Sequence, residues 1–193
     1  DPDHPMNEAQ TTAFADIVAR FPGVRTSIGN SAGWLNGIQG DLARPGIGLY
    51  GGNPFSGRSN PLQPVAALQG RVLQIHTVRP GESVGYSASW VAEAETRVAA
   101  IGLGYADGLP RHLSGTGEMA LEDGRRCPIL GRVSMDTTMI DVSAAPEVSL
   151  GDWVECFGAN LDVDEVADRA GTLGYELLTR VGSRVPRVPG PLR

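Results

Sequence analysis

The chain has 193 residues, a formal net charge of −6 and 41% hydrophobic residues, a composition typical of a globular protein with one large or two small domains. Its basic residues are scattered, so no basic patch indicates nucleic-acid binding. No apolar run approaches the ~20 residues that span a bilayer, so we expect no membrane association. The opening DPDHPMNEAQ lacks the positive and apolar regions of a signal peptide, and we therefore expect a cytoplasmic protein.

Cysteine and lysine usage narrow the possible chemistry. Cys127 and Cys156 stand far apart, with neither a C-x-x-C pair nor paired histidines, so neither a disulfide framework nor a metal site is indicated. We interpret both as reduced core residues. All sixteen basic residues are arginine, a bias that arginine-rich codon usage would also produce. Without lysine, this chain cannot form a Schiff base through its own side chains.

The first sixty residues predict alternating helices and strands. Residues 7–21 predict a helix whose apolar face includes Ile17 and Phe21, with Asn7 and Gln10 arranged like a capping box. Strands are expected at residues 24–29 and 46–52, on either side of a short helix, SAGWLNGI, that begins at Ser31. Two strand–helix units are too few for a closed barrel, so this segment is interpreted as the tail of a larger α/β domain.

A stretch rich in turn-forming residues, GGNPFSGRSNPLQP, separates this segment from a β-rich remainder. One later helix is predicted in LDVDEVADRAG, with Asp162 or Asp164 near its start and Gly171 at its end. The expected organisation is the C-terminal portion of a (β/α)8 barrel in residues 1–62 and a β-rich C-terminal domain in residues 63–193. The predicted strands lie in VAALQGRVLQIHTV, RVAAIGLGY, EMALEDGRRCPILGRV, TTMIDVS and DWVECFG.

Two stretches of the first domain have features of a phosphate site. In NSAG, Asn30 or Ser31 precedes a helix and would offer free N–H groups and a hydroxyl to an anion, although an ordinary helix cap explains the same residues. In ARPGIGLYGG, Gly46 would let the backbone at Ile47 approach a ligand closely. Arg44 is a permanent cation with a planar donor face, and a surface ion pair is its alternative role.

The stretch VGYSASW places Tyr86 between a glycine and a serine, where either packing or chemistry would explain it. The motifs NSAG, ARPGIGLYGG, GESVGYSASW, GLGYADGLPR, GRVSMD, GYELLTR and RVPR follow one another in an order and spacing similar to the C-terminal half of the pyridoxal-phosphate-dependent alanine racemases. The resemblance runs from about Asn7 to Pro189. Any one motif is weak evidence, but a chance match of all of them in the same order and spacing has a very small probability.

The resemblance implies a set of residues for pyridoxal 5'-phosphate. In the family, the residues that match Ser31, Gly46 and Ile47 hold the cofactor phosphate, and the tyrosine that matches Tyr175 also donates to it. The residue that matches Arg44 faces the pyridine nitrogen. Because an arginine keeps its proton, the ring nitrogen stays unprotonated and is a weaker electron sink, which suits racemisation.

The resemblance also implies catalytic and substrate-binding residues. Tyr86 matches the base that handles the Cα proton on the L-face, while a cofactor-binding lysine handles the D-face. Tyr105 matches a tyrosine of the substrate access route, Met135 would present its N–H to the substrate carboxylate, and Asp136 would shape the entrance. Other residues of the implied access route are Asp107, Arg111 and Arg132.

Three departures from the family pattern stand out. Ser27 occupies the position where many members have a histidine that supports the pyridine-facing arginine, and Ser87 replaces the usual glycine after the catalytic tyrosine. The cofactor lysine is missing, and we expect it before Asp1.

We therefore expect part of a homodimeric enzyme that interconverts L- and D-alanine, with active sites shared between subunits and no activity from this chain alone. The alternatives are a broad-specificity amino-acid racemase of the same fold type, and an inactive fragment that acts as a dimerisation module.

Overall fold

The computed structural model describes residues 1–190. It divides into two compact units, Asp1–Gln63 and the chain from Pro64 onwards, which we call the N-terminal unit and the C-terminal unit. Each is described by itself. No helix in the described part of the chain is long and apolar enough to cross a membrane.

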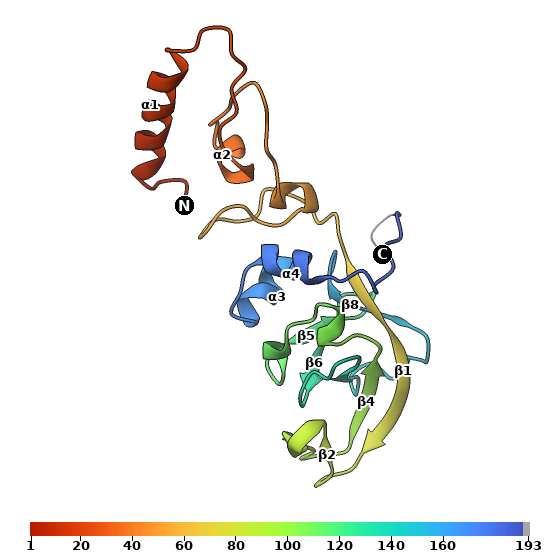
Figure 1. Ribbon diagram of the computed structural model, residues 1–193. Helices are drawn as coiled ribbons and strands as arrows, with labels where there is room; N and C mark the ends of the chain where they lie inside the picture. Colours follow the sequence, from red (N-terminus) through yellow and green to blue (C-terminus); the bar gives the residue numbers. More distant parts are fainter. Residues whose placement is uncertain (191–193) are drawn as a thin grey trace. The chain divides into compact units, whose positions relative to one another are not determined.

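The N-terminal unit contains helix α1 (Met6–Val18), helix α2 (Ser31–Leu35) and the 3-10 helix η1 (Ile47–Tyr50) (Figure 1). The predicted capping box at the start of α1 is wrong. Asn7 lies inside the first turn, and its amide donates to the carbonyls of Asp1 (3.0 Å) and Pro2 (2.9 Å) instead. The helix also ends before Phe21.

Neither strand predicted in the N-terminal unit is present. Among residues 1–63, no strand is assigned. A strand exists only where a neighbouring strand satisfies its backbone groups, and here Thr26 makes a single such contact, accepting from the Leu42 N–H at 3.0 Å. Residues 47–50 instead wind into η1, which starts with a hydrogen bond from the Leu49 N–H to the Gly46 carbonyl at 3.0 Å.

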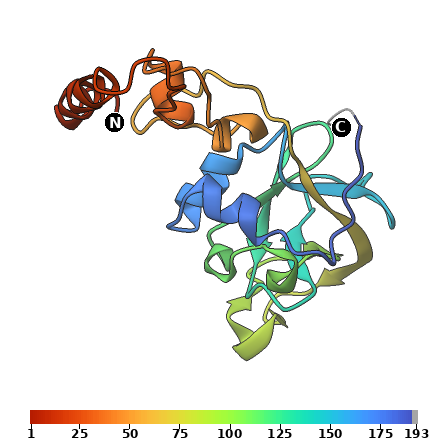
Figure 2. The same ribbon diagram turned by 45° about the horizontal axis from the view of Figure 1, so that its top comes forward.

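The C-terminal unit is a closed antiparallel barrel with strand order β1-β4-β7-β6-β5-β8 (Figures 1 and 2). A register shift between Val72 and Gln74 lets one end of β1 pair with β8 and the other with β4. A separate two-stranded ribbon joins β2 (Ser83–Val84) to β3 (Trp90–Val91). The barrel strands are β1 (Leu68–Val78), β4 (Thr96–Ile101), β5 (Glu118–Ala120), β6 (Arg126–Leu130), β7 (Thr138–Asp141) and β8 (Trp153–Phe157).

Apolar side chains from these strands fill the barrel. The strand predictions for the C-terminal unit are confirmed, and β-branched and long aliphatic residues alternate into a common core. Cys127 and Cys156 are both buried and free, as predicted. Burial, helped by the nearby Asp141, raises the pKa of the Cys127 thiol to about 11. Core residues that are almost fully buried include Val72, Ile101, Met119, Ile140 and Val154.

Two helices follow the barrel. Helix α3 (Val163–Arg169) begins at Asp162, whose carboxylate accepts from the Asp164 N–H at 2.9 Å, and the chain leaves it through Gly171 in a left-handed conformation. Helix α4 (Gly174–Arg180) was not predicted. The helix is only two turns long, and the burial of Leu177 against the core stabilises it.

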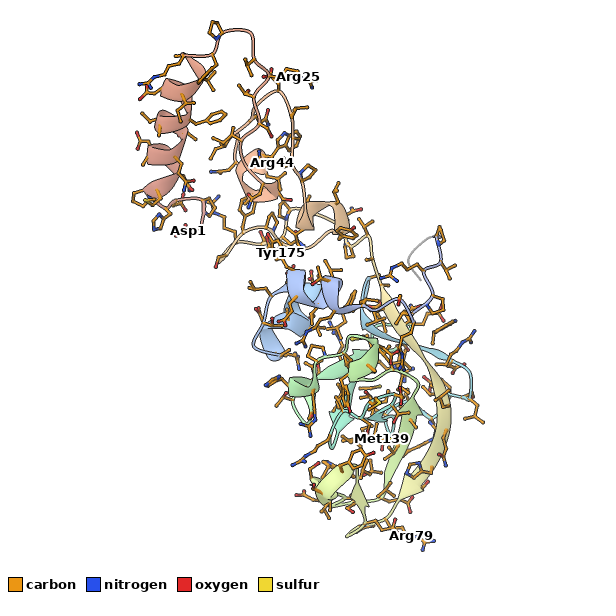
Figure 3. The ribbon with its side chains drawn as sticks, viewed as in Figure 1. Asp1, Arg25, Arg44, Arg79, Met139 and Tyr175 are labelled. Atoms are coloured by element: carbon orange, nitrogen blue, oxygen red, sulfur yellow. The ribbon has the colours of Figure 1, made fainter. Side chains whose placement is uncertain are left out.

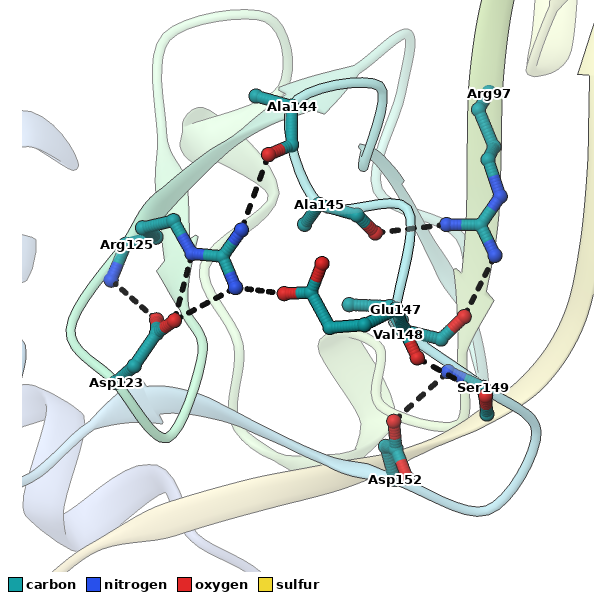
Figure 4. A network of polar contacts seen from close by, with 9 residues as sticks. All are labelled: Arg97, Asp123, Arg125, Ala144, Ala145, Glu147, Val148, Ser149 and Asp152. Carbon is teal, nitrogen blue, oxygen red and sulfur yellow. Dashed lines mark hydrogen bonds and ion pairs between the residues drawn. The ribbon is translucent and has the colours of Figure 1, made fainter.

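Two arginines hold the loop between β7 and β8 (Figure 4). Arg97 donates to the carbonyls of Ala145 (2.8 Å) and Val148 (2.6 Å). Arg125 donates to the Ala144 carbonyl at 3.0 Å and pairs with Asp123 and Glu147. The loop carbonyls therefore accept hydrogen bonds from charged donors in place of a strand partner, and these bonds hold the β7–β8 loop in place.

A buried carboxylate closes the turn after β8. Glu155 is 2% exposed, and its oxygens accept from the N–H groups of Ala159 (3.2 Å), Asn160 (2.7 Å) and Leu161 (2.8 Å). These contacts satisfy three backbone donors that have no strand partner. The side chain therefore organises the turn from within the protein.

Candidate active site

The C-terminal unit contains a cleft of about 660 Å³. Four of the residues that sequence analysis singled out, Tyr86, Tyr105, Arg111 and Met135, lie together in its wall. Arg111 and Arg180 make the wall basic, which suits a small ligand that carries a carboxylate. The other lining residues are Gly108, His112, Val133 and Ser134.

Tyr86 begins a tight turn, the 3-10 helix η2 (Tyr86–Ala88), between the two strands of the ribbon. Ser87 (φ 62°) and Ala88 (φ 47°) are the two non-glycine residues with positive φ among residues 1–190. A side chain in this conformation costs about 1–3 kcal/mol and persists only where the surroundings impose it. The turn therefore presents Tyr86, which is 69% exposed, at a fixed point of the cleft.

The segment after β6 supports this turn. A Cβ atom on Gly131 would lie 2.6 Å from the carbonyl oxygen of Val84, so only glycine allows the two segments to approach this closely. Beside it, Arg132 Nη1 donates to Ser87 Oγ at 3.4 Å. Ser87, the departure from the family glycine, thus keeps the left-handed conformation and gains a polar contact.

Tyr105 and Met135 are joined by backbone hydrogen bonds. Tyr105 begins the 3-10 helix η3 (Tyr105–Asp107), its N–H donates to the Ser134 carbonyl, and the Ala106 N–H donates to the Met135 carbonyl, both at 3.0 Å. The Met135 N–H itself donates to no group in the described chain. The N–H group is therefore free to bind a carboxylate beside the Tyr105 ring.

Asp107 and Asp136 lie just outside the lining and share one cation. Arg184 Nε donates to Asp107 at 2.7 Å, and Arg184 Nη2 donates to Asp136 at 2.6 Å. These hydrogen bonds, with that to Asp136 the stronger, raise the pKa of the Arg184 guanidinium. Asp136, predicted to shape an entrance, is thus tied to the loop of Tyr105 by an arginine from the RVPR motif.

Sequence reasoning did not assign roles to His112, Arg180 or Arg184. Their signals were present but weak: His112 follows Arg111 in GLGYADGLPRH, and Arg180 ends GYELLTR. Within the described residues, neither Arg111 nor His112 forms an ion pair, whereas Arg180 pairs with Glu176 at 3.0 Å. The cleft therefore carries a net positive character next to two tyrosines.

In the N-terminal unit, Ser31 organises the loop predicted to bind phosphate. Its buried hydroxyl oxygen accepts from the N–H groups of Gly46 (2.9 Å) and Gly48 (3.1 Å). The hydroxyl keeps its own proton to donate, and the Ile47 N–H between them has no acceptor in the described chain. The Gly46 N–H donates to Ser31, and the role of Gly46 in a phosphate site stays a prediction.

Arg44 is held by the residue that replaces the family histidine. Arg44 Nη1 donates to Ser27 Oγ at 2.7 Å, and the Ser27 hydroxyl donates to the Leu42 carbonyl at 3.0 Å. Next to it, Thr26 donates through its N–H (2.7 Å) and hydroxyl (2.8 Å) to Asp41. These hydrogen bonds, the backbone one first, hold the pKa of Asp41 below its ordinary value.

Tyr175 and Arg44 belong to different units. Tyr175 lies in α4 of the C-terminal unit, whereas Arg44 follows α2 in the N-terminal unit (Figure 3). Partial burial, reinforced by the nearby Asp164 carboxylate, raises the pKa of the Tyr175 phenol. Tyr175 therefore remains protonated near neutral pH and can act as a hydrogen-bond donor.

The sequence matches two family descriptions, "Alanine racemase, C-terminal domain" over residues 65–189 and "Alanine racemase, N-terminal domain" over residues 1–54. The chain belongs to the alanine racemase family. It is 48% identical to an alanine racemase of Rhodospirillum rubrum, with 100% of this chain and 52% of the relative covered. It is 47% identical to the alanine racemase of Acidiphilium cryptum, covering 97% and 53%.

Solved alanine racemases have the same fold. The biosynthetic enzyme from Pseudomonas aeruginosa is 42% identical with a TM-score of 0.85, and the alignment covers 96% of this chain and 53% of that one. The enzyme from Bartonella henselae, solved with covalently bound pyridoxal phosphate, is 35% identical with a TM-score of 0.87 over 97% and 53%. The chain thus spans about half the length of the racemases it matches.

Proposed function

We propose that this chain supplies half of an alanine racemase that interconverts L- and D-alanine. The observation that carries the proposal is the cleft in which Tyr86 and Tyr105 lie with the unused Met135 N–H. A phenol positioned near a carboxylate-binding N–H is the arrangement needed to move a proton at the α-carbon of an amino acid.

The N-terminal unit fits a pyridoxal 5'-phosphate cofactor. The Ser31 hydroxyl and the Ile47 N–H offer two donors to a phosphate from one ordered loop, and Gly46 keeps that loop against Ser31. Tyr175 is proposed as a further donor to the phosphate because it matches the family tyrosine with that role. When bound, this cofactor supplies the electron sink that makes the α-proton of an amino acid acidic.

Arg44 would face the pyridine nitrogen. Its guanidinium carries a permanent charge and offers no acceptor, so it donates to that nitrogen and keeps it unprotonated. The hydrogen bond from Arg44 to Ser27 at 2.7 Å leaves other guanidinium donors for this contact. Ser27 therefore takes over the support that many family members obtain from histidine.

In the proposed reaction, Tyr86 handles the Cα proton on the L-face. Met135 binds the substrate carboxylate through its N–H, Tyr105 lines the access route, and Asp136 shapes its entrance. A phenol with a pKa of ~10 needs neighbouring cations to act as a base at neutral pH, and cations of the cleft wall such as Arg111 suit that requirement.

The second base and the partner subunit remain parts of the proposal. This chain contains no lysine, so the D-face base would come from sequence outside these 193 residues. We propose a homodimer in which Tyr86, Tyr105 and Met135 act in the active site of the partner. The cytoplasmic location expected from the sequence stays a prediction.

Purified full-length protein loaded with pyridoxal phosphate tests this function. We expect conversion of L-alanine to D-alanine, and we expect this chain alone to show none. A panel of other L-amino acids is the control for specificity, because comparable turnover of larger side chains would identify a broad-specificity racemase instead. A full-length protein that dimerises but racemises no amino acid would support the dimerisation-module alternative and contradict the proposal.

A further inference from the structure

Arg184 joins two carboxylates that belong to two different loops of the cleft. Its Nε lies 2.7 Å from Asp107 Oδ1 and its Nη2 lies 2.6 Å from Asp136 Oδ1. A planar guanidinium can donate in two fixed directions at once, whereas a lysine ammonium is a point charge on a flexible stem. The distance between the two carboxylates is therefore set by the shape of one side chain.

Each carboxylate lies next to a residue that would contact the substrate. Asp107 ends the 3-10 helix that Tyr105 begins, and Asp136 follows Met135 directly. Asp107 is 7% exposed, and its other oxygen accepts from the Gly104 N–H at 2.8 Å. It is thus a rigid anchor, and Arg184 transmits its position to the Met135 segment.

We propose that Arg184 is a positioning residue for substrate binding, which orients the Met135 N–H relative to the Tyr105 ring. The inference rests on the proposed function, because it concerns the carboxylate subsite of that same cleft. Backbone hydrogen bonds from Tyr105 and Ala106 fix one edge of the two loops. Arg184 fixes the other edge, and Asp136 accepts from no other donor in the described chain.

Arg184 contributes more to geometry than to folding. The pair with Asp136 adds little stability, because the Arg184 side chain is 49% exposed and that of Asp136 is 58% exposed. Asp107 is buried, but it keeps the Gly104 N–H as a hydrogen-bond partner when Arg184 is removed. The cleft side chains also stand on a closed barrel with its own core. Removing Arg184 should therefore loosen the Met135 segment without unfolding the C-terminal unit.

Steady-state kinetics of full-length Arg184→Gln and Arg184→Lys test this role. Met135 binds the carboxylate in both ground state and transition state, so its misplacement should raise KM with little change in kcat. We expect Arg184→Gln to raise the KM for alanine about tenfold, the effect of one weakened charged hydrogen bond. Arg184→Lys keeps the charge but cannot span both carboxylates, so it should restore only part of the affinity.

Arg187→Gln is the matched control. Arg187 lies in the same motif, and its donors reach only the backbone carbonyls of Val181, Gly182 and Val185. It should lower the thermal midpoint about as much as Arg184→Gln does, with KM unchanged. Equal KM for the two variants would show that Arg184 acts only on tail stability, and that result would overturn the proposal.

A second readout separates this inference from the proposed activity. In protein labelled with 13C-methyl methionine, the Met135 signal, assigned from its loss in Met135→Leu, should shift on titration with acetate. Arg184→Gln should weaken that titration about tenfold and Arg187→Gln should not. If the wild type fails to racemise alanine, the proposed function fails, but the acetate titration still decides the role of Arg184: an unchanged Met135 titration in Arg184→Gln overturns it.

Discussion

The two units of the chain differ in how they hold their functional residues. In the C-terminal unit, a closed barrel with a continuous apolar core carries the cleft. In the N-terminal unit, Ile47 and Ser31 are the buried side chains, and α1 buries none. Its polar motif is ordered instead by hydrogen bonds that backbone N–H groups donate to side-chain oxygens, such as those of Ser31 and Asp41.

The contrast shows that hydrogen bonds can order a loop without forming a hydrophobic core. A few hydrogen bonds between loop residues 15 or 17 positions apart are enough to shape a loop around Ser31 or to hold Arg44. They do not remove apolar surface from water, and Ile17 (54%) and Phe21 (58%) remain exposed. The C-terminal unit, in contrast, buries enough apolar surface to support its own site.

The largest effect should come from removing the side chain that the C-terminal unit is proposed to contribute to catalysis. Tyr86→Phe in the full-length protein removes the proposed L-face base and should slow racemisation about 1000-fold. Exchange of the Cα proton, followed by NMR in deuterium oxide, should fall far more for L-alanine than for D-alanine. The D-alanine rate is the internal control, and an equal loss on both faces would argue against Tyr86 as the L-face base.

Limited trypsin digestion of this chain tests the contrast directly. Arg20, Arg25 and Arg58 lie in the N-terminal unit, where little core must open before cleavage, whereas cleavage inside the barrel requires global unfolding. We expect cleavage of the first group to be about 100-fold faster or more. Mass spectrometry of the time course should show a resistant fragment that contains the barrel. Equal rates in both units would show that the C-terminal unit is not independently stable.

A smaller effect should follow from breaking the turn after β8. Glu155→Ala leaves three N–H groups, of which that of Leu161 is buried, without their acceptor and should lower the free energy of unfolding of the barrel by about 2–3 kcal/mol. Glu155→Gln keeps one acceptor oxygen and should cost less. The exposed Glu122→Ala is the control in urea unfolding, and an equal midpoint for all three variants would show that the Glu155 contacts add no stability.

The smallest effect concerns the arginine network of the β7–β8 loop. Hydrogen bonds from Arg125, the side-chain one first, hold the pKa of Asp123 below its ordinary value of 3.8. A lowered pKa in the folded state adds stability above the ordinary pKa and loses it as pH falls through the folded value. The wild type should therefore unfold at a slightly higher temperature than Asp123→Asn near neutral pH, with the gap closing in acid. A gap that is independent of pH would exclude an electrostatic cause.

Sequence reasoning anticipated most of the C-terminal unit because strands there alternate apolar and polar residues between clear turn signals. The hairpin around Asp123-Gly124 is an example, since β5 and β6 pair across it. Helix α4 escaped because it begins without a capping side chain, whereas α3, which is equally short, is announced by Asp162. In the N-terminal unit, residues 24–29 and 46–52 have strand composition, but composition does not supply a pairing partner.

The sequence by itself determined the family, the order of the motifs and which residue types can take part in chemistry: Tyr86, Arg44 and Ser31 are recognisable from the shared order and spacing of their motifs. Only the tertiary structure decided what these residues touch. It brought Tyr86, Tyr105 and Met135 into one cleft. It placed Ser27 where its hydroxyl accepts a hydrogen bond from Arg44, and it placed Arg184 between Asp107 and Asp136. The physical reason is that a hydrogen bond or ion pair depends on distances of about 3 Å between atoms, and for residues 48 or 77 positions apart chain folding alone sets those distances.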